Sequence, residues 1–188
     1  FKKYNKKVKF FVTGNPMIKD IFIKNKVVFL MHPKTLFINK QEENNFLELI
    51  KILSEKYKNK ILVRTHPYSN TKFNFDNVIT HNSKEKTLIK TLEETFCSIS
   101  IRSSSVIEAA RMGIIPVIFS RNIRNINKAF YLFEKVNSTK LFLENPKEVI
   151  NLIDILTKNK KFKLDLSKKI KNKSAKLINI IGVKSKIK

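Results

Sequence analysis

Short apolar runs alternate along this chain with longer stretches in which apolar residues recur every three or four positions. The runs are rich in β-branched residues and end in polar or turn residues, which is typical of buried parallel strands. They cover residues 8–14, 26–32, 60–66, 76–81, 97–101 and 115–120.

The longer stretches have the spacing of amphipathic helices. Residues 41–59 place acidic residues in the first turn and basic residues in the last, as the helix dipole favours. Residues 83–95 predict a second helix, with Ser83 as a candidate N-cap and Glu85 near its start. The apolar stripe of the first helix is formed by Phe46, Leu49, Ile50 and Leu53.

Two further helices are predicted downstream. Residues 103–113 combine a serine N-cap, small alanines that suit close packing on a sheet, and Gly113 as the stop. Residues 145–159 begin with an Asn cap and a Pro suited to the first helical turn. The stretch 120–144 reads as a loop and helix followed by a short strand.

This alternation predicts an α/β fold: right-handed βαβ crossovers forming a Rossmann-like parallel sheet with helices on both faces. We expect residues 1–160 to form this domain and residues 161–188 to form a basic helical tail with a frayed end.

The formal charge of +24 first suggests a nucleic-acid or polyanion binder. However, the lysines are spread among Asn and Ile along the whole chain, and only five of the 39 basic residues are Arg. This distribution indicates a solvated basic surface rather than a focused groove, so nucleic acid is disfavoured as a partner. The arginines stand at 64, 102, 111, 121 and 124.

Composition also bears on compartment. The single Cys97 excludes an intramolecular disulfide, and there is neither an apolar run near 18 residues nor a signal-peptide pattern, so we expect a cytoplasmic protein. Because the chain opens at Phe1 rather than Met, we also expect either a fragment or a processed or trimmed product.

Candidate chemistry gathers at the ends of the predicted strands, where open parallel sheets bind ligands. His32, His66 and His81 each close one of these runs. Arg64 stands two residues before His66, so the two side chains share one side of an extended strand.

The run Ser103, Ser104 and Ser105 lies between a strand and a helix start. Backbone N–H groups in a first helical turn lack intrahelical partners, and serine hydroxyls add donors, so this point suits an anion. The chain has no Gly-rich phosphate loop, and the serines could take its place. The alternative is that one serine is only an N-cap and the others are spacers.

The segments "THP" (65–67), "NVI" (77–79) and "SSSVIEAARMGIIPVIF" (103–119) resemble the donor-binding C-terminal half of GT-B glycosyltransferases, over about residues 10–160. The HP and SS pairing is most similar to bacterial sialyltransferases and related cytidine-nucleotide enzymes. Residues 11–22 resemble the hinge segment of those families. The small-residue helix and returning strand also resemble lipid-A-disaccharide synthase and UDP-N-acetylglucosamine 2-epimerases.

The resemblance implies that His66 and Ser103 to Ser105 hold the donor phosphate, with Arg64 beside them and His66 as the catalytic candidate. It offers two ribose-binding carboxylates, Glu85 and Glu108, and favours Glu85 if the nucleotide is cytidine-based. The acidic motif that supplies the sialyltransferase base is absent from the chain, and the D-S-G-G of the epimerases is replaced by R-S-S-S.

The implied activity is an inverting transfer of a sugar, such as sialic acid, from a CMP- or UDP-linked donor to a glycan or glycolipid. The general base is expected from an N-terminal half outside this chain. No metal or other cofactor is expected, because neither an Asp-x-Asp triplet nor a His/Cys cluster is present. The basic surface could hold the enzyme against anionic lipid at the inner membrane face. The alternatives are a 2-epimerase, a polyol-phosphate transferase, or a non-enzymatic polyanion binder.

Overall fold

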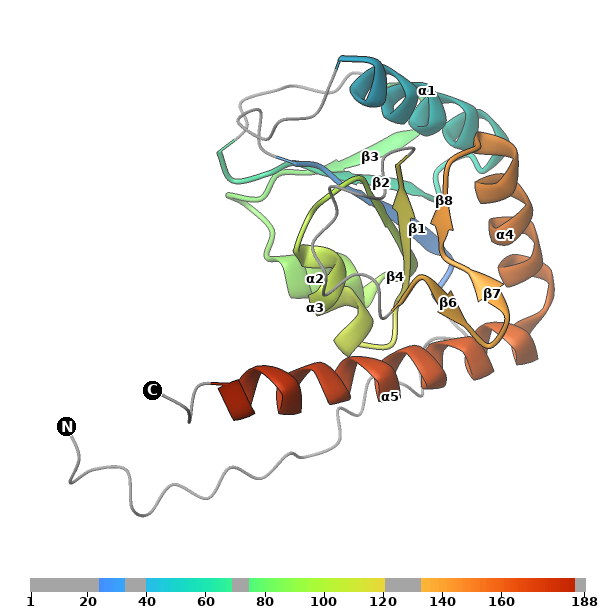
Figure 1. The fold of residues 1–188 in the computed structure, drawn as a ribbon. Helices are drawn as coiled ribbons and strands as arrows, with labels where there is room; N and C mark the ends of the chain where they lie inside the picture. Colours follow the sequence, from blue (N-terminus) through green and yellow to red (C-terminus); the bar gives the residue numbers. More distant parts are fainter. Residues whose placement is uncertain (1–23, 33–39, 69–74, 121–132, 185–188) are drawn as a thin grey trace.

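The computed structural model describes residues 24–32, 40–68, 75–120 and 133–184. The strand predicted at 8–14 and the hinge-like segment 11–22 lie outside these residues. Within them, the sheet has six parallel strands in the order β3-β2-β1-β4-β5-β8 (Figure 1). The strands are β1 (Lys26–Leu30), β2 (Ile61–Arg64), β3 (Val78–His81), β4 (Thr95–Ser100), β5 (Ile115–Phe119) and β8 (Phe142–Leu143).

Strand order reverses at the centre of this sheet. The chain moves outward from β1 to β2 and β3, then returns to place β4 on the other side of β1 and continues to β5 and β8. This is the strand order of Rossmann folds. The order reverses between β1 and β4, and such sheets bind ligands outside the carboxyl ends of the strands at this topological switch point. The predicted fold class is therefore confirmed.

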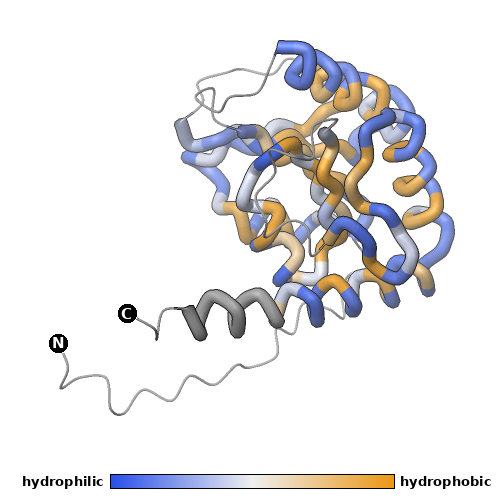
Figure 2. Tube along the Cα trace, in the orientation of Figure 1, coloured by the Kyte–Doolittle hydropathy of each residue, from blue (hydrophilic) through white to orange (hydrophobic). Residues whose placement is uncertain are grey.

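Helices cover both faces of the sheet, as predicted. One core cluster joins alternate strand residues such as Phe29 to α1 (Lys40–Lys56) and α4 (Pro146–Lys158). The other joins the intervening residues, such as Val28, to α2 (Leu88–Glu93) and α3 (Ser105–Arg111). Figure 2 shows mainly hydrophobic strands and helices in which hydrophilic and hydrophobic residues alternate, as expected for elements that bury one face.

The last helix, α5 (Lys160–Lys184), packs across α3 below the sheet (Figure 1). The Ser167 hydroxyl donates to the carbonyl of Gly113, and the Ser174 hydroxyl lies 3.3 Å from the carbonyl of Ala110. Leu166 and Ile170 belong to the main hydrophobic core. These contacts attach α5 to the turn that ends α3.

Gly113 ends α3 as predicted, with a positive φ of 76° that favours glycine. Asn145 caps α4 by accepting from the Lys147 N–H at 2.9 Å. The start of the second helix was predicted wrongly: Thr87, not Ser83, is the N-cap of α2 and accepts from the Lys90 N–H.

Residues 133–144 contain more structure than the single short strand expected there. β6 (Lys135–Val136) and β7 (Thr139–Lys140) form an antiparallel hairpin before β8 joins the main sheet. Both turn residues, Asn137 and Ser138, have positive φ, as hairpin turns that match strand twist require. No helix among the described residues is long and apolar enough to cross a membrane.

Candidate functional site

A pocket of about 210 Å³ opens at the carboxyl ends of β2, β1 and β4, next to the switch point. Four of the seven residues proposed from the sequence as site residues line it together, although they come from segments about forty residues apart. The described residues that line it are Leu30, Met31, Arg64, Thr65, His66, Pro67, Leu88, Ser103 and Ser105.

His66 is half-buried at the pocket edge, immediately after β2. Its Nδ1 accepts a hydrogen bond from the Tyr68 N–H at 3.2 Å, so the neutral ring carries its proton on Nε2. Burial lowers the pKa of His66 below 6.5. The imidazole is therefore a neutral group at neutral pH and has one N–H to donate.

Two backbone N–H groups of the serine segment are already engaged in local hydrogen bonds. The Ser103 N–H donates to Ser100 Oγ at 2.9 Å, and the Ser105 N–H approaches Ser103 Oγ at 3.4 Å. These local bonds occupy N–H groups that the sequence analysis expected to be available. Ser104 is exposed, makes no side-chain capping bond, and does not line this pocket.

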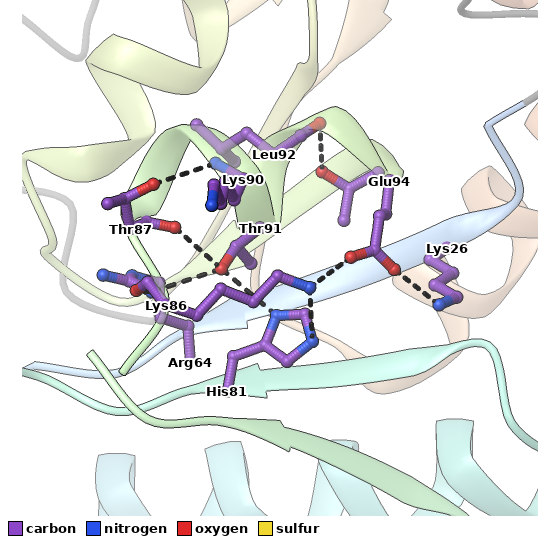
Figure 3. Close-up of polar contacts among 10 residues, drawn as sticks. Lys26, Arg64, His81, Lys86, Thr87, Lys90, Thr91, Leu92 and Glu94 are labelled. Atoms are coloured by element: carbon purple, nitrogen blue, oxygen red, sulfur yellow. Dashed lines mark hydrogen bonds and ion pairs between the residues drawn. The ribbon is translucent and has the colours of Figure 1, made fainter. Parts of the chain in front are cut away.

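Arg64 lines the pocket, but its guanidinium is already engaged (Figure 3). Nη1 donates to the Lys86 carbonyl at 2.6 Å and to Thr91 Oγ1 at 3.2 Å. The side chain is buried, with a relative exposure of 9%. The proposed phosphate contact therefore has to come from the remaining guanidinium donors.

Neither candidate ribose carboxylate lines the pocket. Glu85 is exposed in the turn after β3 and accepts from Asn82 Nδ2 at 3.1 Å. Glu108 points from α3 to an ion pair with Arg111 at 2.7 Å, with its side chain 53% exposed. Ribose binding by Glu85 or Glu108 therefore stays a prediction, and the lining of this pocket does not support it.

Thr65 and Glu42 at this edge were not proposed from the sequence, and His32 was named only as a strand-end histidine without a role. Thr65 lines the pocket, and its place between two proposed residues could have indicated it. His32 is 7% exposed, and within the described segments its Nδ1 has no hydrogen-bond partner. Glu42 is buried beneath the ends of β4 and β5, where Arg102 and Ser120 contact its carboxylate. Among the residues that the structure describes, no group of three or more acidic, His or Cys side chains could hold a metal.

The three histidines predict an acid-sensitive fold. Burial is the largest cause lowering the pKa of each below 6.5. The unfolded chain therefore binds more protons below this pH, so stability is complete above 6.5 and falls as the pH drops toward the folded-state values. For the deeply buried His32 and His81, we expect a loss of up to about 2 kcal/mol between about pH 7 and 5.5.

Urea unfolding across this pH range measures the effect. A variant carrying His32→Asn and His81→Asn should show a flatter profile, and an unchanged slope would contradict the assignment to these side chains.

The sheet order and this edge together define a Rossmann-like α/β unit. No protein-family model matches the sequence, and no curated protein matches it. Several solved structures contain this fold at low sequence identity, and the chain spans less than half the length of each of the two described next.

The first is a glycotransferase of kitacinnamycin, with a TM-score of 0.51 at 11% identity over 81% of this chain and 40% of the other. The second is UDP-GlcNAc 2-epimerase from Neisseria meningitidis bound to UDP-GlcNAc, with a TM-score of 0.52 at 15% identity. That match covers 88% of this chain and 47% of the epimerase.

Proposed function

We propose that this chain is the donor-binding half of a GT-B glycosyltransferase and that the switch-point pocket holds the phosphate of a nucleotide sugar. The observation that carries the proposal is the presence of His66, Ser103 and Ser105 in one pocket. The position of the pocket at the strand ends supports it, because Rossmann-like sheets bind nucleotides there. The fold shared with a glycotransferase and a nucleotide-sugar epimerase supports it as well.

His66 supplies hydrogen bonding rather than a full proton in this proposal. A neutral ring that holds its hydrogen on Nε2 donates to a phosphate oxygen without first being protonated. As the sugar departs, negative charge grows on that phosphate, and donors placed in advance stabilise it. The serine hydroxyls at the facing wall add donors to the same anion.

The size of the pocket limits what it holds. Its volume of about 210 Å³ lies below the range of roughly 300–1,000 Å³ for complete ligand sites. It therefore suits the phosphate-bearing part of a nucleotide sugar, while the sugar, the acceptor and the general base are assigned to parts of the protein outside this pocket. Transfer of an acidic sugar such as sialic acid from CMP, to a glycan or glycolipid acceptor, is the finer form of the proposal.

One alternative is supported by a specific comparison. The epimerase neighbour is bound to UDP-GlcNAc, so a UDP-linked donor and epimerase chemistry on this scaffold are the second candidate. A polyol-phosphate transferase would use the same phosphate site. For the transferase we propose a place at the inner, cytoplasmic face of an anionic membrane, held by the basic surface.

Nucleotide titrations test the proposal. We expect the chain to bind CMP, CDP or UDP, and His66→Asn to weaken the binding by about 10–100-fold, since a lost bond to a charged group costs about 1.5–3 kcal/mol. His66→Gln should restore much of the affinity, because its amide nitrogen reaches the position of Nε2. Lys161→Ala, an exposed charge on α5, is the control and should bind as wild type.

Two results would contradict the proposal. One is the absence of nucleotide binding by the folded chain. The other is binding to any polyanion that weakens steeply with salt and is the same in His66→Asn, since this is the behaviour of a non-specific electrostatic surface.

A further inference from the structure

His81 is a buried histidine that does not line the pocket. It is hydrogen-bonded to Thr91 and Lys86, the two residues that hold the pocket residue Arg64 (Figure 3). His81 ends β3, next to Arg64 in the sheet register, and is 8% exposed. Its Nδ1 lies 3.1 Å from Thr91 Oγ1 on α2, and its Nε2 lies 3.2 Å from Lys86 Nζ. Both ring nitrogens therefore have a partner.

The partners determine where the ring carries its proton. An ammonium group has donors and no acceptor, so Nε2 must accept from Lys86. Nδ1 then carries the hydrogen and donates it to Thr91 Oγ1. The Thr91 hydroxyl directs its own hydrogen to the Thr87 carbonyl at 3.3 Å. Donors and acceptors match throughout this arrangement.

Glu94 keeps the lysine in place. One of its carboxylate oxygens pairs with Lys86, and the other pairs with Lys26 at 2.6 Å. Hydrogen bonds from these two lysines lower the pKa of Glu94 to about 2, so the carboxylate is ionised at neutral pH. Lys86 is thereby held as a donor towards His81.

Arg64 depends on the same two residues that contact His81. Its Nη1 donates to the hydroxyl of Thr91 and to the backbone carbonyl of Lys86. Thr91 Oγ1 thus accepts from both the imidazole and the guanidinium. Any change that turns Thr91 or moves the Lys86 segment also changes the direction of Arg64 at the pocket wall.

We propose that His81 is a positioning residue for the pocket: its Nδ1–H holds Thr91, and Thr91 with the Lys86 segment fixes the guanidinium of Arg64 for a bound phosphate. The identity of the ligand, a nucleotide phosphate, rests on the proposed function. The hydrogen bonds among His81, Thr91 and Arg64 do not depend on it.

The charges around the ring are consistent with this role. Lys86, Lys26 and Arg64 are cations that oppose protonation of His81, whereas the carboxylate of Glu94 favours it. Burial is the largest cause that lowers the pKa of His81. A protonated ring would have no acceptor for Lys86.

Two isosteric substitutions test the inference. In His81→Asn the side-chain amide reaches the position of Nδ1, which keeps a donor for Thr91. In His81→Gln it reaches the position of Nε2, which keeps a partner for Lys86 and removes the donor. Nitrogen-15 NMR of the wild-type chain should show His81 as the Nδ1–H tautomer. Rotation of the Arg64 guanidinium should be slow in wild type and His81→Asn and faster in His81→Gln.

Affinity for CMP should fall by about tenfold in His81→Gln, the cost of about one hydrogen bond, and stay near wild type in His81→Asn. If His81→Gln does not fold, Thr91→Val replaces it and Thr91→Ser serves as the control, because valine keeps the shape of the side chain and loses the hydroxyl.

An Nε2–H tautomer in wild type, or equal Arg64 rotation in the two members of the pair tested, would overturn the inference. Failure of wild type to bind any nucleotide would count against the proposed function alone, since tautomer and rotation are measured without ligand.

Discussion

Replacing Phe46 with alanine is expected to lower the free energy of unfolding by about 3–5 kcal/mol. Phe46 has no exposed surface. Its ring packs edge-to-face against Phe29 on β1, with 5.3 Å between ring centroids, and stacks with Phe119 on β5, with 6.4 Å between ring centroids. It therefore joins α1 to two strands of the sheet. Removing the ring leaves a cavity between rigid elements that cannot close together.

Urea unfolding of the variant measures this loss. Tyr68→Ala is a matched control, because this aromatic side chain is 87% exposed and its removal should cost less than about 0.5 kcal/mol. Similar losses in the two variants would show that Phe46 does not have the packing role described.

Replacing Arg102 with methionine is expected to destabilise the fold by about 3 kcal/mol. Arg102 Nη2 lies 3.2 Å from a carboxylate oxygen of Glu42, and the Ser120 hydroxyl donates to the other oxygen at 2.7 Å. The side chains of Arg102 and Glu42 are 15% and 8% exposed. Loss of the cation removes the opposite charge that Arg102 places beside this buried carboxylate.

The double variant Arg102→Met with Glu42→Gln tests this cause. Removing the negative charge as well should recover at least half of the lost stability, because neither partner then carries an unbalanced charge. Additive losses in the double variant, measured by the same urea unfolding, would contradict the explanation. Both residues lie at the edge of the sheet where we propose that a nucleotide binds, so nucleotide affinity should be measured in parallel.

Strands and helices that follow clear patterns of apolar residues could be predicted from the sequence. Five described strands follow predicted apolar runs: β1, β2, β4 and β5 are buried on both faces, and the edge strand β3 is only partly buried. The helices α1 and α4 follow wide apolar stripes. The start of α2 could not be predicted, because Ser83 and Thr87 are both capable caps. In the structure, Asn82 forms a turn before the helix, so Ser83 lies in this turn and Thr87 becomes the cap. The Asn82 side chain accepts from the Lys84 N–H, and the Asn82 carbonyl accepts from the Glu85 and Lys86 N–H groups.

The candidate site was predictable to the extent that it depends on topology. His66, Ser103 and Ser105 meet because parallel strands end at one edge, and this follows from the order of the elements. The partners of each side chain do not follow from the pattern. Glu42 reads as a first-turn acid that complements a helix dipole, and it is buried beside Arg102. Arg64 reads as a free cation, and it is bonded to Thr91.

The position of Cys97 has a practical consequence. Cys97 lies within β4, between β1 and β5, with no exposed surface, and burial raises the pKa of its thiol far above the ordinary value. A thiol reagent cannot attack it while these strands stay paired, because attack needs an accessible thiolate. Cys97 is therefore a natural reporter: the rate of its labelling counts how often the centre of the sheet opens.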